Sequence, residues 1–430
     1  MNLSKQLELF LTPESLTLIR LIRTEAERMD LPLYFVGGSV RDLMLGRAVQ
    51  DFDLTVEGDA SKLAESVLRS FGGRVVFHSR FGTATWTLDE TTYKRLDVPL
   101  LGASSFPPFL DFISARSETY SKPGALPTVK HAAIDDDLRR RDFSINAMAL
   151  RLDGRFWGQL HDPLGGQADL QEKHIRILHT RSFVDDPTRM LRAVRYSVRY
   201  GFEIEPETLS LINEESRAVL ASLSGERLRH EIDLMFEESD PSTMLQHLGK
   251  WNLLAPIHSS LQGANFQLPF LEILSAEFGD FTIPNILTFK RTLGWILWLM
   301  QLSEYDVDAI SKRLDFPTLL GRAARAASEL LGNLPSLVGK SPSQWTFHLE
   351  AMPAISVYAV YLVRKEPALR EYLINWRKVK STITGDHLKA RGLEPGPRYA
   401  EILRQLRAAW LDGEVKNERE EETLLNKLIK

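Results

Sequence analysis

The sequence predicts an α+β protein, in which a small head with a mixed sheet is followed by an all-α remainder. Short apolar runs bounded by glycine, proline and aspartate are concentrated in roughly the first 180 residues and are typical of strands. Beyond that point the strand signals vanish, and apolar residues recur at helical spacing between prolines such as Pro241, Pro284 and Pro353. A sheet-containing segment followed by a run of helices is the pattern of the α+β class.

The composition is that of an ordinary globular protein, with 430 residues, 43% hydrophobic and 26% charged. The absence of cysteine excludes disulfides, zinc–thiolate sites and thiol catalysis. No apolar run approaches the roughly 20 residues of a membrane helix and the N-terminus lacks a signal-peptide core, so we expect a cytoplasmic protein. The net charge of −4 argues against indiscriminate coating of nucleic acid, although the last 55 residues hold 12 Lys/Arg against 9 Asp/Glu.

The elements of the head follow from local patterns. The first thirty residues predict helix, because Leu18, Ile22 and Ala26 recur at helical spacing. The Gly37-Gly38 turn separates a strand from a short helix at 40–45. Strands are expected at 33–36, 52–56, 74–78, 83–88, 93–98 and 109–115. A polar segment at 116–135 predicts a mobile loop, and a further helix is expected to begin at Asp135.

Two carboxylates stand at the start of the second strand. Asp51 and Asp53 share one face of that strand, whereas Phe52 and Leu54 point into the core. Adjacent carboxylates repel unless a divalent cation lies between them, and oxygen ligands without His or Cys suit Mg²⁺. On the pair alone, a solvated strand end is the more frequent explanation.

The glycine turn makes an anion site the stronger interpretation. Gly37 and Gly38 join a strand to a helix N-terminus, where backbone N–H groups can face a phosphate. Arg41, one turn later, can fork onto phosphate oxygens, although a Gly-Gly pair would serve an ordinary turn equally well. A phosphate cradle just ahead of a metal-binding pair predicts a nucleoside-triphosphate site that is neither a P-loop nor a Rossmann turn.

A later helix carries arginine on one side. Asp186 suits the N-cap and Pro187 the first helical position. One arc of the helix is then arginine and the opposite arc apolar, the arginines being Arg189, Arg192, Arg195 and Arg199. The alternative is a solvated basic face, but such a face normally mixes charges. We expect a triphosphate or an RNA backbone as the counter-charge.

Three ordered segments resemble the signatures of class II tRNA nucleotidyltransferases. This CCA-adding family shares its head with bacterial poly(A) polymerases in the DNA polymerase beta superfamily. The segments are 37–56 (GGSVRDLMLGRAVQDFDLTV), 137–150 (DLRRRDFSINAMAL) and 185–202 (DDPTRMLRAVRYSVRYGF). Weaker similarity covers 224–236 and the C-terminal segment 384–414. Between them the chain is matched only in being helical.

The resemblance implies a division of the chain and a role for each part. It implies a nucleotidyltransferase head at 31–180, a helical neck with the nucleotide-selecting helix at 181–245, a helical body at 246–375 and a tRNA-binding helical tail at 376–430. The helical extension at 1–30 has no role that we can assign. No HDxGK-type stretch is present, so the hydrolase domain that some members append is not expected.

The resemblance also implies functions for individual residues. Asp51 and Asp53 fall on the catalytic, metal-binding aspartates. Asp111 is a candidate third carboxylate; the alternative is that it is a strand-end carboxylate paired with Arg116. The remaining positions fall on nucleotide contacts: Gly37, Gly38, Arg41 and Arg141 near the triphosphate, Asp186 and Arg189 at the base, and Arg192 and Arg195 nearby. One departure is Asp185, which stands where the family usually has Glu.

The expected reaction is attack by a tRNA 3′ hydroxyl on the α-phosphate of CTP or ATP, with two Mg²⁺ ions and release of pyrophosphate. An aspartate can accept a hydrogen bond from the amine of cytosine or adenine, and an arginine can donate to a ring nitrogen or carbonyl, so Asp186 and Arg189 could reject UTP and GTP. The substrates are then the tRNA 3′ end, CTP and ATP, with no membrane or protein partner inferred. Alternatives are a partial adder of CC or A, a poly(A) polymerase and, more remotely, a non-catalytic RNA-binding protein.

Overall fold

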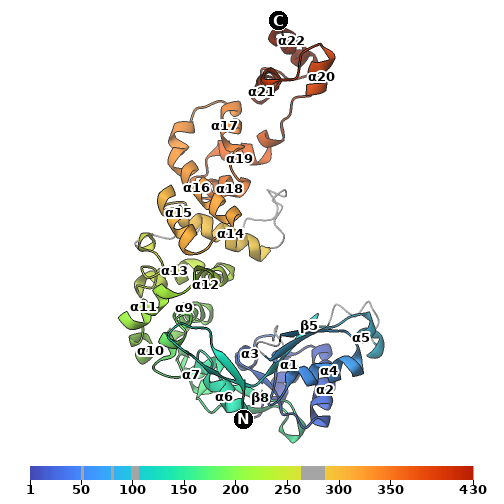
Figure 1. Ribbon diagram of the computed structural model, residues 1–430, viewed down its shortest axis with the longest axis vertical. Helices are drawn as coiled ribbons and strands as arrows, with labels where there is room; N and C mark the ends of the chain where they lie inside the picture. The colour runs from blue at the N-terminus through green and yellow to red at the C-terminus, as the bar shows by residue number, and fades with distance from the viewer. Residues whose placement is uncertain (50–52, 79–81, 98–105, 263–285, 430) are drawn as a thin grey trace. The chain divides into compact units, whose positions relative to one another are not determined.

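The computed structural model describes residues 1–49, 53–78, 82–97, 106–262 and 286–429 (Figure 1). The chain forms two compact units, Met1–Leu223 and Ser224–Lys430, and each is considered by itself. The first unit holds a mixed sheet and the second is helical, so the predicted α+β class is confirmed. Among the described helices, none has the length and apolar character required to cross a membrane.

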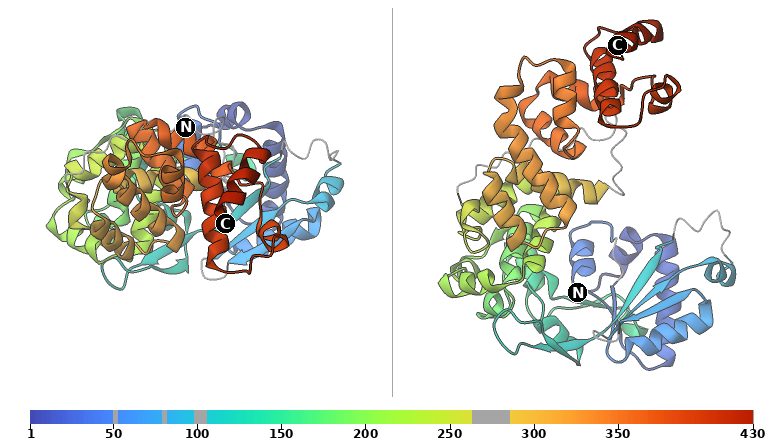
Figure 2. Two further views of the ribbon diagram at one scale, coloured as in Figure 1. Left: turned by 90° about the horizontal axis from the view of Figure 1, so that it is seen from above. Right: turned by 45° about the horizontal axis from the view of Figure 1, so that its top comes forward.

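Figure 2 shows the sheet of unit 1 from two further sides. Its seven described strands follow the order β3-β4-β5-β2-β1-β8-β9. The strands are β1 (Leu33–Val36), β2 (Asp53–Val56), β3 (Arg74–His78), β4 (Thr83–Thr87), β5 (Phe109–Ser114), β8 (Ala149–Arg151) and β9 (Gln159–His161). β2 and β5 run parallel, and the other neighbouring pairs are antiparallel. A parallel pair needs a long crossover, which here includes β3 and β4.

One face of the sheet packs against helix α4 (Ala60–Phe71), which contacts β3, β4 and β5. Asp59 starts this helix by accepting the Ser61 N–H. Alternate residues of the strands, such as Leu54, Trp86 and Phe112, are buried on this side. The opposite face is covered near β1 and β8 by helix α6 (Ile134–Arg139), in a cluster that includes Val36, Leu138 and Ala149.

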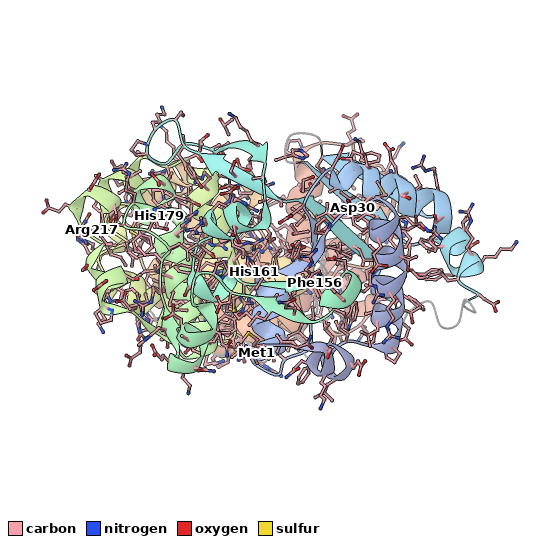
Figure 3. The ribbon with its side chains drawn as sticks, turned by 90° about the horizontal axis from the view of Figure 1, so that it is seen from below. Met1, Asp30, Phe156, His161, His179 and Arg217 are labelled. Atoms are coloured by element: carbon pink, nitrogen blue, oxygen red, sulfur yellow. The ribbon has the colours of Figure 1, made fainter. Side chains whose placement is uncertain are left out.

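The N-terminal residues form two helices, α1 (Ser4–Phe10) and α2 (Pro13–Arg28). Both contribute to the core of unit 1, because Leu7, Ile19 and Ile22 are fully buried. The chain begins beside β9, where the Met1 carbonyl accepts the Leu160 N–H at 3.0 Å (Figure 3). Helix α2 contacts α4, and α1 contacts α3 (Gly38–Met44).

Two expectations for the head are wrong. A strand is predicted at 93–98, but helix α5 (Glu90–Arg95) includes 93–95 and a turn follows at 96–97, because Asp89 and Thr92 form a capping box that starts a helix; residue 98 lies outside the described residues. The expected loop at 116–135 contains a hairpin of β6 (Arg116–Thr119) and β7 (Thr128–His131). Backbone pairing between these two polar strands overrides the weak local preference for loop.

The second half of unit 1 is mainly helical. Its elements are η2 (Ser144–Asn146), η3 (Gly154–Phe156), α7 (Gly166–Glu172), β10 (His174–Ile175), α8 (Ser182–Asp185), α9 (Thr188–Tyr200), β11 (Glu203–Ile204), α10 (Pro206–Ser210) and α11 (Glu214–Ser222). β10 and β11 form a short parallel pair. The expectation that strands end near residue 180 is therefore wrong by one two-residue strand, which is too short to produce a sequence pattern.

Unit 2 is built around buried aromatic side chains. Its elements are α12 (Gly225–Glu237), α13 (Pro241–Lys250), η4 (Ser259–Leu261), α14 (Ile286–Leu299), α15 (Glu304–Arg313), α16 (Thr318–Leu337), α17 (Pro342–Leu349), α18 (Ala354–Arg364), α19 (Pro367–Ile374), η6 (Trp376–Lys378), α20 (Gly385–Ala390), α21 (Pro397–Leu411) and α22 (Glu418–Leu428). Trp295 and Trp298 stack at 5.3 Å and are fully buried beside Phe236. The last three helices share a smaller apolar cluster that includes Leu388, Leu406 and Leu425.

Candidate active site

The pairing of the strands brings two predicted carboxylates together. Asp53, the first residue of β2, pairs directly with Asp111 of the parallel strand β5. Phe35 of β1 pairs with Leu54, so Val36, which precedes the glycine turn, comes next to Asp53 on the other side. Asp53, Asp111 and the end of β1 therefore lie in one row across neighbouring strands. Asp51, the other predicted metal ligand, lies outside the described residues.

Asp111 lies beside Asp53 in the sheet. Its carboxylate accepts a hydrogen bond from Thr85 Oγ1 at 2.5 Å, and Arg116 forms an ion pair with Glu118 at 3.3 Å. Asp111 is also an interior residue of β5 and not a strand end. Two carboxylates on adjacent strands repel unless a cation is shared, so the oxygen donors of Asp53 and Asp111 suit Mg²⁺.

The two glycines make room for two arginines. Gly37 has φ +67°, and a methyl group at its Cα would overlap Nη1 of Arg141. A methyl group on Gly38 would lie 3.3 Å from Nη2 of Arg41. Gly37 is thus needed both for its positive φ and because the Arg141 guanidinium packs directly against it, whereas a methyl group on Gly38 would only crowd Arg41.

Arg41 is buried, with 5% of its surface exposed. Its Nε and Nη2 donate to the two carboxylate oxygens of Asp42 at 3.0 and 3.1 Å, and its Nη1 donates to Asn146 Oδ1 at 2.5 Å. Burial lowers the pKa of Arg41, but the bonds to Asp42 outweigh it and the net pKa is raised. The Arg41 guanidinium, which is predicted to donate to phosphate oxygens, donates to Asp42 and Asn146 instead. These bonds use three of its five N–H groups.

A buried carboxylate holds the neighbouring arginines. Asp137 is fully buried and accepts from Nη2 of Arg140 at 2.8 Å and Nη2 of Arg141 at 2.9 Å. Burial alone would raise the pKa of Asp137, but the two guanidinium groups lower it more. Asp137 was not predicted from the sequence, although it stands three and four residues before two arginines that follow the helix, and this spacing is a signal for such a contact.

A second missed carboxylate connects the head to helix α9. Asp142 Oδ2 accepts from Nε and Nη2 of Arg192 at 2.9 and 2.5 Å, and its Oδ1 accepts from Asn146 Nδ2 at 3.0 Å. Burial raises the pKa of Asp142, but Arg192 outweighs it and holds the pKa well below its usual range. Because Asn146 also accepts from Arg41, hydrogen bonds run without a gap from Arg41 to Arg192.

Helix α9 differs from the prediction at its start and on its arginine side. It begins at Thr188, not at Pro187, but Asp186 still accepts from the Thr188 N–H at 3.2 Å. The alternative of a solvated basic face is wrong for Arg189 and Arg195, which are 4% and 6% exposed. Arg189 donates to Ser182 Oγ and to the Arg140 carbonyl, both at 2.7 Å.

Two tyrosines on α9 lie among these arginines. The guanidinium carbon of Arg41 is 4.7 Å from the ring centre of Tyr200 and 5.6 Å from that of Tyr196. Arg195 is 5.1 Å from the Tyr196 ring. Burial raises the pKa of Tyr200 to about 12. Neither ring was predicted from the sequence, although their spacing of four residues on an arginine-bearing helix places them on the same side.

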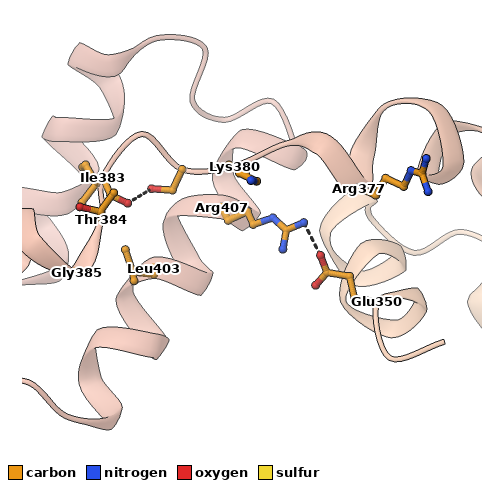
Figure 4. A pocket seen from close by; sticks show the side chains of 9 residues that line it. Glu350, Arg377, Lys380, Ile383, Thr384, Gly385, Leu403 and Arg407 are labelled. Carbon is orange, nitrogen blue, oxygen red and sulfur yellow. Dashed lines mark hydrogen bonds and ion pairs between the residues drawn. The ribbon is translucent and has the colours of Figure 1, made fainter. Parts of the chain in front are cut away.

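Two further features of the described residues could bind a ligand. In unit 1, ligand atoms of Asp169, Glu172 and His174 lie within 4.8 Å of one another, but Asp169 also pairs with Arg176 at 3.0 Å. In unit 2, a pocket of about 460 Å³ lies where the expected tail begins (Figure 4). Cationic side chains of Arg377, Lys380 and Arg407 line it, and Arg407 pairs with Glu350 at 2.5 Å.

Comparison with known proteins identifies the family. Residues 33–176 match the poly A polymerase head domain, and residues 201–263 match the probable RNA- and SrmB-binding site of polymerase A. An A-adding tRNA nucleotidyltransferase of Halalkalibacterium halodurans is 33% identical over 95% of this chain and 92% of its own. The chain belongs to the class II tRNA nucleotidyltransferase family.

Other relatives of this nucleotidyltransferase agree. The A-adding tRNA nucleotidyltransferase of Geobacter sulfurreducens is 32% identical over 93% of this chain, which spans 45% of that relative. Other relatives bear the names CC-adding tRNA nucleotidyltransferase and CCA-adding enzyme. A solved structure of a CCA-adding enzyme with ATP has a TM-score of 0.78 and 26% identity, and covers 100% of this nucleotidyltransferase and 99% of the solved chain.

Proposed function

We propose that this nucleotidyltransferase adds AMP from ATP to the 3′ end of tRNA without a nucleic-acid template. The observation that carries the chemistry is the Asp53–Asp111 pair, which lies beside the glycine corner and its two arginines. The choice of A addition rests on the 33% identity with an A-adding relative along 95% of this chain. CC addition and complete CCA addition, from CTP or from both nucleotides, are the alternatives, because relatives with those names also match.

Asp51 and Asp53 would hold Mg²⁺, with Asp111 as a third carboxylate. When bound, two such ions lower the pKa of the RNA hydroxyl and neutralise charge on the phosphates. The Gly37 N–H is already donated to the Met148 carbonyl at 3.0 Å, so the corner would meet the triphosphate through the Gly38 N–H, between Arg41 and Arg141. Preformed bonds from Asp137 and Asp42 hold these arginines in place before the nucleotide arrives, which reduces the reorganisation that binding requires.

Nucleotide choice would fall to Asp186 and Arg189, with Arg192 and Arg195 as further contacts. A carboxylate that accepts from the adenine amine disfavours guanine, whose amine is at another position, and uracil, which has none. Arg189 is already oriented by Ser182 and the Arg140 carbonyl, so its remaining donors face a fixed direction. Cytosine also carries a suitable amine, which is why CTP must be tested directly.

The helical parts would bind the tRNA. We propose the division into head (31–180), neck (181–245), body (246–375) and tail (376–430), with the tail contacting tRNA. The pocket that includes Arg377 and Lys380 supports this division, because clustered cations suit a phosphate backbone.

The test uses tRNA transcripts that end at the discriminator base, at C or at CC, each with one labelled triphosphate and Mg²⁺. We expect one A on the CC-ended transcript, followed by arrest, and no extension of the other two. CC or CCA added to the shorter transcripts would identify a CC-adding or CCA-adding enzyme. Long A tracts would identify a poly(A) polymerase, and absence of any incorporation would indicate a non-catalytic RNA-binding protein.

A further inference from the structure

The sheet face that carries Asp53 and Asp111 has a covered half and an open half. The row of paired residues that includes both aspartates continues on one side to Val36 and Ala149, which are buried beneath α6. On the other side it continues to Thr85 of β4 and Val76 of β3. Val76 is 41% exposed, so the part of this sheet face that α6 covers ends near the aspartates.

The open half extends along three strands. In β4 and β5, residues on the α4 side, such as Trp86, Leu110 and Phe112, are buried. Every residue that alternates with them on the Asp111 side is at least partly exposed, and Phe109 is 50% exposed. We call this set the open sheet face: Arg74, Val76, His78, Thr83, Thr85, Thr87, Phe109, Asp111 and Ile113.

We propose that the open sheet face binds the last nucleotides of the acceptor RNA and directs its 3′ hydroxyl to Asp53 and Asp111. The proposal rests on the proposed function, which requires an RNA end at these carboxylates. The surface is continuous with them, since Asp111, Thr85 and Val76 are neighbours in one row. Two strand spacings cover about 10 Å, which corresponds to roughly three stacked nucleotides.

The chemistry of the open sheet face suits single-stranded RNA. Phe109 provides an exposed ring on which a base can stack, next to Asp111 on the same strand face. The column of Thr83, Thr85 and Thr87 offers hydroxyl groups for the 2′-hydroxyls and phosphates of RNA. Arg74 adds positive charge at the edge strand. A helix or a second copy on this face would cover the approach to the carboxylates that the RNA hydroxyl must reach.

The decisive variant is Phe109→Ala, with Phe77→Ala as its matched control. Phe77 is also exposed, at 45%, but it points to the opposite side of the sheet, since it pairs with buried Ala84. We expect Phe109→Ala to raise the KM for CC-ended tRNA roughly tenfold while the KM for ATP changes less than about twofold. Phe77→Ala should leave both values unchanged. Equal effects of the two variants, or no effect of Phe109→Ala, would overturn the proposal.

A second measurement does not need turnover or a variant. A tRNA of the same length as the CC-ended transcript, with 4-thiouridine as its last nucleotide, is photocrosslinked to the intact protein, and the adduct is mapped by mass spectrometry. We expect adducts within β3, β4 or β5 on the open sheet face; adducts confined to α4 or to unit 2 would overturn the proposal. If Phe109→Ala instead changes the sedimentation of the protein alone, a second copy occupies the face and the proposal is wrong. Failure of the protein to bind or extend any tRNA would refute the proposed function itself.

Discussion

Gly37 in the head and Gly294 in α14 are both tightly packed against a neighbouring side chain, but the two neighbours differ in kind. At both residues, a methyl group would overlap a neighbouring side chain. The neighbour of Gly37 is the guanidinium of Arg141, which belongs to the candidate active site, whereas the neighbour of Gly294 is the buried ring of Phe236. Close packing therefore positions the guanidinium of Arg141 in one unit and fills an apolar core in the other.

The difference between the two regions extends beyond the glycines. Around Gly37 the buried groups are charges held by hydrogen bonds, as at Asp137 and Asp142. Around Gly294 they are rings in contact, with Phe236 and Trp295 at 5.3 Å. Buried charges are weak contributors to stability but fix geometry, whereas buried rings contribute mainly to stability. Activity and stability should thus respond to different substitutions.

The largest expected effect is that of Asp53→Asn on incorporation. Loss of one carboxylate at the metal site removes several kcal/mol of transition-state stabilisation, so we expect about a 1000-fold slower single turnover of labelled ATP. Binding of tRNA should be retained. Asp59→Asn is the control, since Asn serves equally well at the start of α4 and the rate should not change. Normal turnover of Asp53→Asn would show that the metal assignment is wrong.

Gly37→Ala should lower kcat/KM for ATP by about 100-fold, because displacement of Arg141 by about 1 Å disturbs the alignment of the triphosphate. The control is Gly154→Ala, because Gly154 also has a positive φ, so its substitution causes the same backbone strain, but it has open space around it. Gly154→Ala should lower the melting temperature slightly and leave kcat/KM unchanged. If both variants lose activity equally, strain and not the seating of Arg141 explains the glycine.

Gly294→Ala should act on stability alone. Overpacking against Phe236 costs about 1–3 kcal/mol, partly offset by about 1 kcal/mol of better helix propensity. Denaturant unfolding should show the loss, while kcat/KM per folded molecule stays constant. Gly332→Ala in α16, where the added methyl group meets open space, should be stabilising. A fall in nucleotide affinity of Gly294→Ala would remove the distinction between the regions.

Arg189→Ala should reduce the preference for ATP over GTP roughly tenfold, since one directed hydrogen-bonding pair with a base contributes about 1–3 kcal/mol. Competition between labelled ATP and unlabelled GTP measures the ratio. Arg199→Ala, at the exposed end of the same helix, is the control. Unchanged selectivity would leave Asp186 and Arg189 with a structural role at the start of α9.

The smallest expected effect is on pH dependence. Arginines hold the pKa values of Asp137 and Asp142 below the ordinary carboxyl value, so their contribution to stability is present above about pH 4 and is lost as the pH falls further. In unit 2, burial raises the pKa of Asp233, so protonation of that carboxyl at lower pH stabilises the folded state, which is the opposite pH dependence. Hydrogen exchange, corrected for intrinsic rates, should show that amides around Asp137 and Asp142 lose protection below about pH 4 before amides around Asp233 do. Equal loss of protection around Asp137, Asp142 and Asp233 would contradict this assignment.

Much of the site could be predicted because its signals are local. The Gly-Gly turn after a strand, the alternation that puts Asp53 on one face and the helical spacing of the arginines each lie within a short segment. Asp142 and Asn146 were missed because their arginine partners, Arg192 and Arg41, are remote in sequence, whereas the partners of Asp137 are near and the signal was overlooked. The expected strand at 93–98 failed because the capping box of Asp89 and Thr92 outweighed β propensity.

The sequence by itself determined which residues alternate across a strand, where the chain turns and which helix concentrates arginine, since these follow from backbone geometry over a few residues. Only the tertiary structure decided that Asp111 pairs with Asp53, that Arg189 and Arg195 are buried and that the sheet is open beyond Asp111. The physical reason is that pairing and burial depend on competition among segments far apart in the chain. Local propensity leaves that competition open, and the packing of the whole unit resolves it.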